Sequence, residues 1–158
     1  MFKVTDHISL FLSVAFLFAT IATLRVNPVL KSKLVKQLDK KEKEYYKEII
    51  LMRRNIYLQG LLFGIIASVI FMLYTKITDK TVILFSAISI TFFINYFYYI
   101  LYPKNKFLLT ELDTRSEKEA WLDIYKSMQF RYHFAFLLGL VFVYFGQHYY
   151  IFNYKKID

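Results

Sequence analysis

The sequence contains no cysteine, which excludes disulfide bonds, thiolate nucleophiles and cysteine metal ligands. Proline and glycine are scarce as well, with two and four occurrences in 158 residues. Both residues interrupt helices, so their scarcity favours long uninterrupted helical segments. The 12 Asp and Glu are outnumbered by 21 Lys and Arg, and the resulting net charge of +9 favours anionic partners such as phospholipid headgroups.

Motifs for catalysis and metal binding are also missing. The HExxH, GxSxG, P-loop and GxGxxG patterns do not occur. The histidines His7, His133 and His148 have no second histidine or carboxylate at the spacing of metal ligands. We therefore expect that the protein is not an enzyme. We also expect no catalytic, cofactor-binding or metal-binding residues.

Long apolar runs dominate what is present. Hydrophobic residues make up 57% of the chain, and four runs free of Asp, Glu, Lys and Arg cover residues 8–24, 56–74, 82–101 and 134–152. A soluble fold of this size cannot bury four such runs, whereas a bilayer accepts them. The sequence predicts an all-α integral membrane protein, a single membrane domain over residues 1–158 with four transmembrane helices. An alternative leaves the first run in the membrane interface, which gives three spans.

The basic residues predict the orientation of the spans. Residues 25–55 carry ten Lys and Arg, residues 102–133 carry six, and the remaining segments together carry five. The positive-inside rule places the two long loops on the cytosolic side and both termini on the non-cytosolic side. Positive charge follows the first run instead of preceding it, so we expect an uncleaved span and not a signal peptide.

The first long loop, residues 28–55, is predicted to be helical. Asn27 is a suitable N-cap and Pro28 suits the first helical position. No Gly or Pro occurs between Pro28 and Gly60, which predicts one helix running into the second span and extending about 42 Å before it. Asp39 and Lys43 stand at the spacing of an i,i+4 ion pair. One face of this helix would carry Leu34, Leu38, Tyr45, Ile49 and Met52.

The second long loop, residues 103–133, is predicted to turn near Pro103 and to begin a helix at Ser116. Glu119 would complete a capping box there. The two loop helices either pack together as a protruding antiparallel hairpin or lie flat on anionic lipid. We favour the hairpin, because both helices are predicted to continue into spans.

Small and polar residues within the spans are the expected helix-packing positions. Small residues at four-residue spacing allow helix backbones to approach closely. The expected packing residues are Gly60, Gly64, Ser68, Thr91, Asn95, Ala135 and Gly139. Self-association through the same positions is a further possibility.

The loop helices are the expected surface for a partner protein or for lipid. The expected contact residues are Lys31, Lys33, Lys36, Lys40, Lys43, Lys47, Trp121, Tyr125 and Met128. Acidic residues alternate with these lysines, whereas nucleic-acid surfaces gather positive charge without interruption. We therefore expect no nucleic-acid partner.

One segment resembles a known group of proteins. The pairs and triplets that carry the resemblance are Tyr102-Pro103-Lys104, Leu112-Asp113, Trp121-Leu122, Tyr125-Lys126, Met128-Gln129 and Tyr132-His133. This pattern is similar to small polytopic virion membrane proteins of nucleocytoplasmic large DNA viruses. It covers roughly 30 residues around 102–133 and includes no catalytic signature. The resemblance implies a component of a virion inner membrane, or of a host internal membrane, that contacts minor capsid proteins.

Three functions follow as hypotheses. The first is a structural, membrane-anchored component of a large assembly, with other membrane or capsid proteins as partners. The second is a small oligomeric ion channel in which Thr91 and Asn95 face the pore. The third is an accessory subunit of a protist membrane complex.

Overall fold

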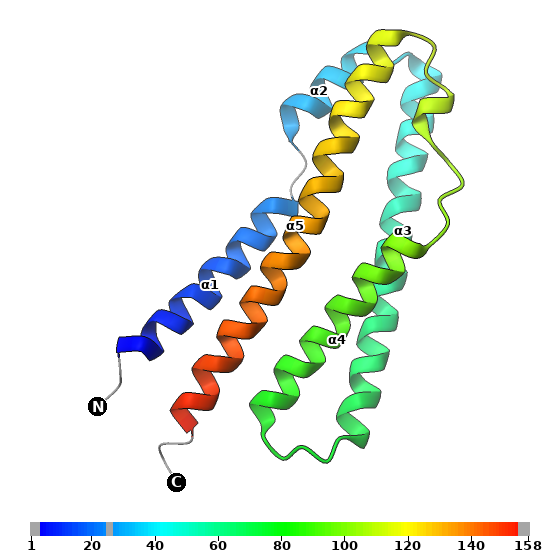
Figure 1. Cartoon of the computed structure of the whole chain (residues 1–158). Coiled ribbons are helices and arrows are strands. Elements are labelled where there is room, and N and C mark those ends of the chain that lie inside the picture. The colour runs from blue at the N-terminus through cyan, green and yellow to red at the C-terminus, as the bar shows by residue number, and fades with distance from the viewer. Residues whose placement is uncertain (1–3, 25–26, 155–158) are drawn as a thin grey trace.

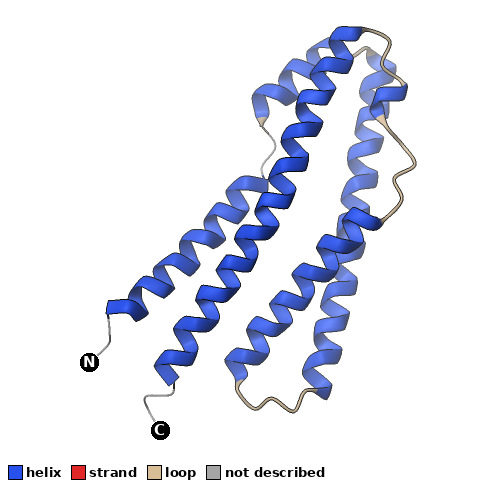
Figure 2. Ribbon diagram, viewed as in Figure 1, coloured by secondary structure: helices blue, strands red, loops and turns tan. Residues whose placement is uncertain are grey.

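The computed structural model describes residues 4–24 and 27–154, and within these ranges every regular element is a helix (Figure 2). The elements in chain order are α1 (Val4–Leu24), α2 (Pro28–Gln37), α3 (Lys40–Tyr74), α4 (Lys80–Leu101), the short 3₁₀ helix η1 (Leu108–Thr110) and α5 (Arg115–Tyr154). Four helices are long and apolar enough to cross a membrane. The predicted all-α class is therefore confirmed, and the helices contain the four predicted spans.

The long helices form two antiparallel pairs. α1 packs along α5, α3 packs along α4, and contact between α4 and α5 joins the pairs. The helices therefore follow one another in space in the order α1, α5, α4, α3 (Figure 1). The start of α1, the end of α5 and the turn between α3 and α4 lie at the same end of the molecule (Figure 1). This arrangement agrees with an even number of crossings.

Two helices are much longer than a bilayer requires. α3 has 35 residues and α5 has 40, whereas about 20 residues cross the hydrocarbon core. The part of α3 before Ile56 extends about 24 Å beyond the apolar run, and the part of α5 before Phe134 about 28 Å, at 1.5 Å per residue. We call these two parts, together with residues 28–39, which include α2, and residues 102–114, the head, and the remaining helices the bundle. The head stands at the end opposite the start of α1 and the end of α5 (Figure 1).

The prediction of one helix from Pro28 into the second span is wrong. α2 ends at Gln37, and α3 begins at Lys40 in the opposite direction (Figure 1). A single helix from Pro28 to the second span would begin about 42 Å from that span, whereas α1 ends at Leu24, only three residues before Pro28. An extended chain advances at most about 3.6 Å per residue, so these three residues cannot cover that distance. α2 therefore leads the chain away from the bundle, and α3 then returns it to the bundle.

A capping box marks the reversal. The Glu42 backbone N–H donates to Asp39 Oδ1 at 2.7 Å, and the Asp39 backbone N–H donates to Glu42 Oε2 at 2.7 Å. These bonds satisfy donors that the first turn of α3 would otherwise leave unpaired. Asp39 therefore caps α3, in place of the ion pair with Lys43 that the spacing predicted. The predicted cap of α2 is confirmed: Asn27 Oδ1 accepts from the Val29 N–H at 3.0 Å, and Pro28 is the first helical residue.

The start of α5 also differs from the prediction. The helix begins at Arg115 and not at Ser116. The backbone N–H of Thr114 donates to Glu117 Oε2 at 2.8 Å, and the Glu117 N–H donates to Thr114 Oγ1 at 3.3 Å. The capping box is therefore Thr114 with Glu117, while Glu119 pairs with Arg115 at 2.9 Å. Two overlapping S/T-x-x-E patterns occur here, and the structure uses the first.

Candidate functional site

Small residues bring the backbones of α3 and α4 close together in the bundle. A β-carbon placed on Gly64 would lie 2.8 Å from the carbonyl oxygen of Thr91. One turn further along, the Ser68 hydroxyl donates to the Ala87 carbonyl oxygen at 2.7 Å, and its oxygen lies 2.8 Å from Thr91 Oγ1. Small residues let the backbones approach, and the two hydroxyl groups then find partners inside the contact.

Gly60 and Asn95 form the next layer of the same contact. A β-carbon on Gly60 would lie 2.8 Å from Asn95 Oδ1. Asn95 is 5% exposed, and its Oδ1 has no hydrogen-bond partner among the described residues. A pore-lining role would require Thr91 and Asn95 to face an open path, whereas both side chains lie against α3.

The other two packing positions lie on α5. Ala135 is buried, and a β-carbon on Gly139 would meet only the Phe92 ring at 3.9 Å, an ordinary contact. Gly146, which the sequence analysis did not select, is tighter: a β-carbon there would lie 2.4 Å from the Phe85 ring and 3.2 Å from Ser13 Oγ. The signal was available, because Gly139 and Gly146 stand seven residues apart on one face of α5.

Stacked aromatic rings join α4 to α5 where the bundle meets the head. Tyr96 stacks on Phe136 with ring centroids 3.8 Å apart and on Tyr132 at 5.4 Å. Tyr99 also packs on Tyr132, at 4.8 Å. The Tyr96 hydroxyl and His133 Nδ1 lie 2.6 Å apart, which makes this histidine part of a polar contact at the level expected for interfacial tyrosines. No group of three His, Asp or Glu among the described residues could hold a metal ion.

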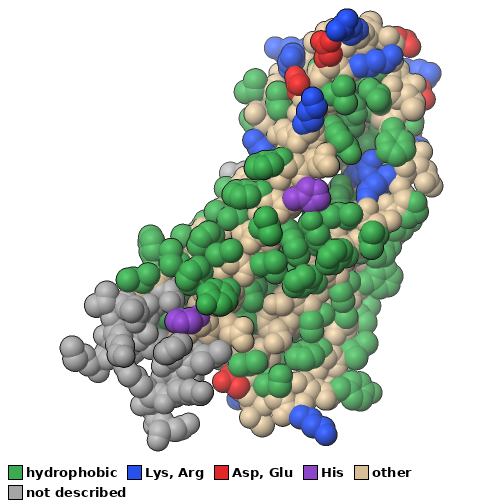
Figure 3. Space-filling view, viewed as in Figure 1, with side chains coloured by type: hydrophobic (Ala, Val, Ile, Leu, Met, Phe, Trp, Pro, Cys, Tyr) green, Lys and Arg blue, Asp and Glu red, His purple; other side chains and the backbone are tan. Residues whose placement is uncertain are grey.

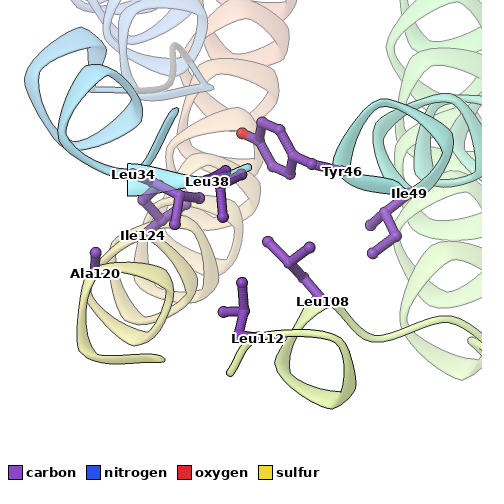
Figure 4. Packing of buried hydrophobic residues seen from close by; sticks show 8 residues of the cluster. All are labelled: Leu34, Leu38, Tyr46, Ile49, Leu108, Leu112, Ala120 and Ile124. Carbon is purple, nitrogen blue, oxygen red and sulfur yellow. The ribbon is translucent and has the colours of Figure 1, made fainter. Parts of the chain in front are cut away.

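The head has a hydrophobic core of its own. Eight buried side chains come from four segments of the chain and point toward one another (Figure 4). They are Leu34, Leu38, Tyr46, Ile49, Leu108, Leu112, Ala120 and Ile124. Leu34, Leu38 and Ile49 of the predicted apolar face are buried in this core, Tyr45 packs partly buried against it, and Tyr46 is an additional member that the pattern did not predict. The loop helices thus pack together instead of presenting their apolar stripes outward.

This packing changes the expected contact surface on α5. Trp121 lies edge-on to Tyr46, with ring centroids 6.2 Å apart, and Met128 packs partly buried against the core. Both side chains therefore contribute to the packing of the head, and their contact with a partner or with lipid stays a prediction. Tyr125 is 47% exposed and is the most exposed of the three.

The lysines predicted to meet a partner lie on the outside of the head, where Figure 3 shows charged side chains gathered above an apolar bundle surface. Lys33 pairs with Asp123 at 3.7 Å, and Lys43 is half-buried. The other four are exposed and form no ion pair with a described carboxylate: Lys31, Lys36, Lys40 and Lys47. An open depression of about 600 Å³ lies along α2 beside them, lined by Pro28, Val29, Ser32, Lys33, Lys36 and Gln37.

Two further cations lie where α3 and α4 leave the bundle, and the sequence analysis missed their pairing. Lys104 Nζ donates to the carbonyl oxygen of Ile100 at 2.8 Å and to that of Tyr99, which caps the C-terminus of α4. Burial lowers the pKa of the Lys104 ammonium below its ordinary value, and the positive charge of nearby Arg53 lowers this pKa further. Arg53 lies over the Phe107 ring, 5.9 Å from its centroid. Arg53 and Lys104 are 51 residues apart, so only the fold brings them together.

These features define a class: an all-helical protein with four helices able to span a membrane and a packed helical head at one end. Comparison with protein-family models, with curated proteins and with solved structures finds no match to this chain.

Proposed function

We propose that this chain is a structural membrane anchor that holds a folded docking head at a fixed height above the bilayer for another component of a large assembly. The observation that carries the proposal is the continuity of the head with the bundle. α3 and α5 pass from one to the other without a break, so the head is not free to swing on a flexible linker. A rigid support of this kind suits a protein that sets the distance between a membrane and a neighbouring layer.

The docking surface proposed is the lysine side of the head. Four exposed lysines have no described carboxylate partner, and one of them, Lys36, lines an open depression along α2 together with Lys33. Complementary charge guides association and selects partners, so the partner expected has an acidic surface. We propose no enzymatic role and no bound cofactor.

The finer proposal is a component of a virion inner membrane that meets minor capsid proteins. Its support is the sequence resemblance over residues 102–133 to virion membrane proteins of large DNA viruses, together with the head described above. Both chain termini would then lie on the far side of the membrane from the capsid, as the distribution of basic residues predicts.

Charge reversal on the head tests the proposal. The docking variant carries Lys36→Glu and Lys40→Glu, and the control carries Lys76→Glu and Lys80→Glu at the opposite end of the molecule, with the same change in net charge. Lysine-directed crosslinking in the native membrane is scored by mass spectrometry at Lys31, Lys43 and Lys47, which neither variant changes. In the wild type and in the control it is expected to attach another protein to the head through these lysines. The docking variant should insert normally and lose most of these crosslinks.

Two results would overturn the proposal. Equal crosslinking of both variants to the same partner would show that Lys36 and Lys40 are not needed for docking. Crosslinks solely between copies of the chain would favour a self-associating protein, and conductance measurements on reconstituted protein would then be the next step.

A further inference from the structure

The pair Arg53 and Lys104 lacks the partners that such charges ordinarily have. Neither side chain forms an ion pair with any carboxylate in the described part of the chain. The Lys104 ammonium has three N–H donors and uses two of them on the carbonyl oxygens of Tyr99 and Ile100. Arg53 lies over the Phe107 ring, 5.9 Å from its centroid, and a guanidinium that packs on an aromatic ring can still donate from its N–H edge. Phe107 follows Lys104 by three residues, so the contact of Arg53 with the Phe107 ring brings the two cations near each other. Two like charges near each other repel, and an anion bound to both would relieve that repulsion.

We propose that Arg53 and Lys104 bind the phosphate of one anionic phospholipid headgroup at the junction of the bundle and the head. Arg53 would bind through the N–H edge of its guanidinium and Lys104 through its third N–H. This site is separate from the lysines of the docking surface.

The position of the pair favours a lipid over free phosphate. Arg53 precedes the apolar run of α3 by three residues, and Lys104 follows the end of α4 at Leu101 by three. Leu101 is 76% exposed, and Tyr102 is also exposed, so an open apolar surface begins next to the cations. Acyl chains can cover that surface while the phosphate meets the two charges. Basic sites between helices at the cytosolic interface recognise lipid headgroups in this way.

Native mass spectrometry of the full chain in detergent tests the site. The probes are phosphatidylglycerol and phosphatidylcholine with the same acyl chains, and inorganic phosphate as a competitor. The wild type is expected to bind one phosphatidylglycerol in preference to phosphatidylcholine. The double variant Arg53→Gln/Lys104→Gln should bind phosphatidylglycerol about thirtyfold more weakly, because each basic group near a membrane surface contributes about fivefold. Its binding of phosphatidylcholine should not change.

A matched control and a milder variant keep the test decisive. Lys36→Gln/Lys40→Gln removes the same charge from the docking side of the head and should leave phosphatidylglycerol binding unchanged. Lys104 also caps α4, so circular dichroism must show that the double variant keeps its helices. If it does not, Arg53→Gln alone decides, with an expected loss of about fivefold.

Three results would overturn the inference. They are equal binding of the two lipids by the wild type, unchanged phosphatidylglycerol binding by Arg53→Gln, and displacement of the lipid by inorganic phosphate at equal concentration. The last result would assign the cations to a free phosphate and not to a headgroup. None of the three bears on the docking proposal, which rests on different lysines and on crosslinking.

Discussion

Gly64 of α3 and the backbone of Thr91 of α4 are in direct contact, and a β-carbon on Gly64 would lie 2.8 Å from the Thr91 carbonyl oxygen. The atom in the way belongs to the backbone of a helix, so it cannot rotate aside as a side chain would. This single approach sets the separation of α3 and α4 over the middle of the bundle.

Gly64→Ala should therefore destabilise the protein by about 1–3 kcal/mol, the usual cost of overpacking a tight contact. Gly139→Ala is the matched control, because its β-carbon would meet only the Phe92 ring at an ordinary 3.9 Å. We expect that control to be as stable as the wild type or up to about 1 kcal/mol more stable, because alanine favours a helix over glycine. Unfolding in mixed detergent, followed by circular dichroism, measures both. Equal losses for the two variants would show that the α3–α4 contact is not as close as described.

Gly60 and Asn95 should show coupled effects. Gly60→Ala places a methyl group 2.8 Å from Asn95 Oδ1, and Asn95→Ala removes that atom. The two substitutions together should cost less than the sum of the single effects by about 0.5–3 kcal/mol, measured as a double-mutant cycle in the same unfolding assay. Strict additivity would mean that the two side chains do not meet.

Asn95→Ala by itself should cost little. A buried polar atom without a partner destabilises a protein by about 1–3 kcal/mol, and its removal offsets part of the cavity that the substitution leaves. A loss above about 3 kcal/mol would indicate that the Asn95 amide makes a strong hydrogen bond, contrary to the geometry described.

The cap of α3 separates two explanations of Asp39. If Asp39 acts as the N-cap, Asp39→Ala should destabilise the head by about 1 kcal/mol, whereas Lys43→Ala should have little effect. If the i,i+4 ion pair were the main contribution, both substitutions would weaken the head to a similar degree. The urea-induced transition of Trp121 fluorescence measures both effects, because the Trp121 ring packs in the head.

Trp121 is the single tryptophan of the chain, and its ring packs against Tyr46 in the head. Its fluorescence therefore reports on the head, while far-ultraviolet circular dichroism reports on all helices. On addition of urea, we expect the Trp121 emission to shift to the red before most of the helical signal is lost. The reason is that urea reaches the head core, whereas lipid or detergent excludes water from the helices of the bundle. Tyr46→Ala should move the fluorescence transition to lower urea, and Tyr125→Ala should leave it in place. Coincident fluorescence and helix transitions would show that the head and the bundle unfold as one unit.

Much of the fold was predictable because the local sequence of each span shows where that span lies. The predicted ends at residues 24, 74 and 101 coincide with the ends of α1, α3 and α4, since polar residues follow each apolar run directly. The errors were confined to the head. No Gly or Pro marks the break at Asp39. The break arises because the chain must extend away from the bundle after α1 before α3 can return to it. The local sequence offered two cap patterns, at Thr114 and at Ser116, and their spacing alone did not distinguish them.

The residues of the candidate site likewise divide into those that the sequence could predict and those that it could not. The small residues of α3 and the exposed lysines of the head could be selected from spacing and charge alone. The inward position of Trp121 and the pairing of Arg53 with Lys104 could not, because each depends on contacts between segments far apart in the chain.

The sequence by itself determined the helical class, the four apolar helices and the uneven distribution of basic charge. These properties follow from local composition, through the transfer of apolar side chains out of water and the hydrogen bonding of each helix within itself. Only the tertiary structure decided that the loops close into a head with its own core, and which charged groups that head brings together. Those outcomes depend on contacts between four separate segments of the chain, and the periodicity of a single segment does not predict such contacts.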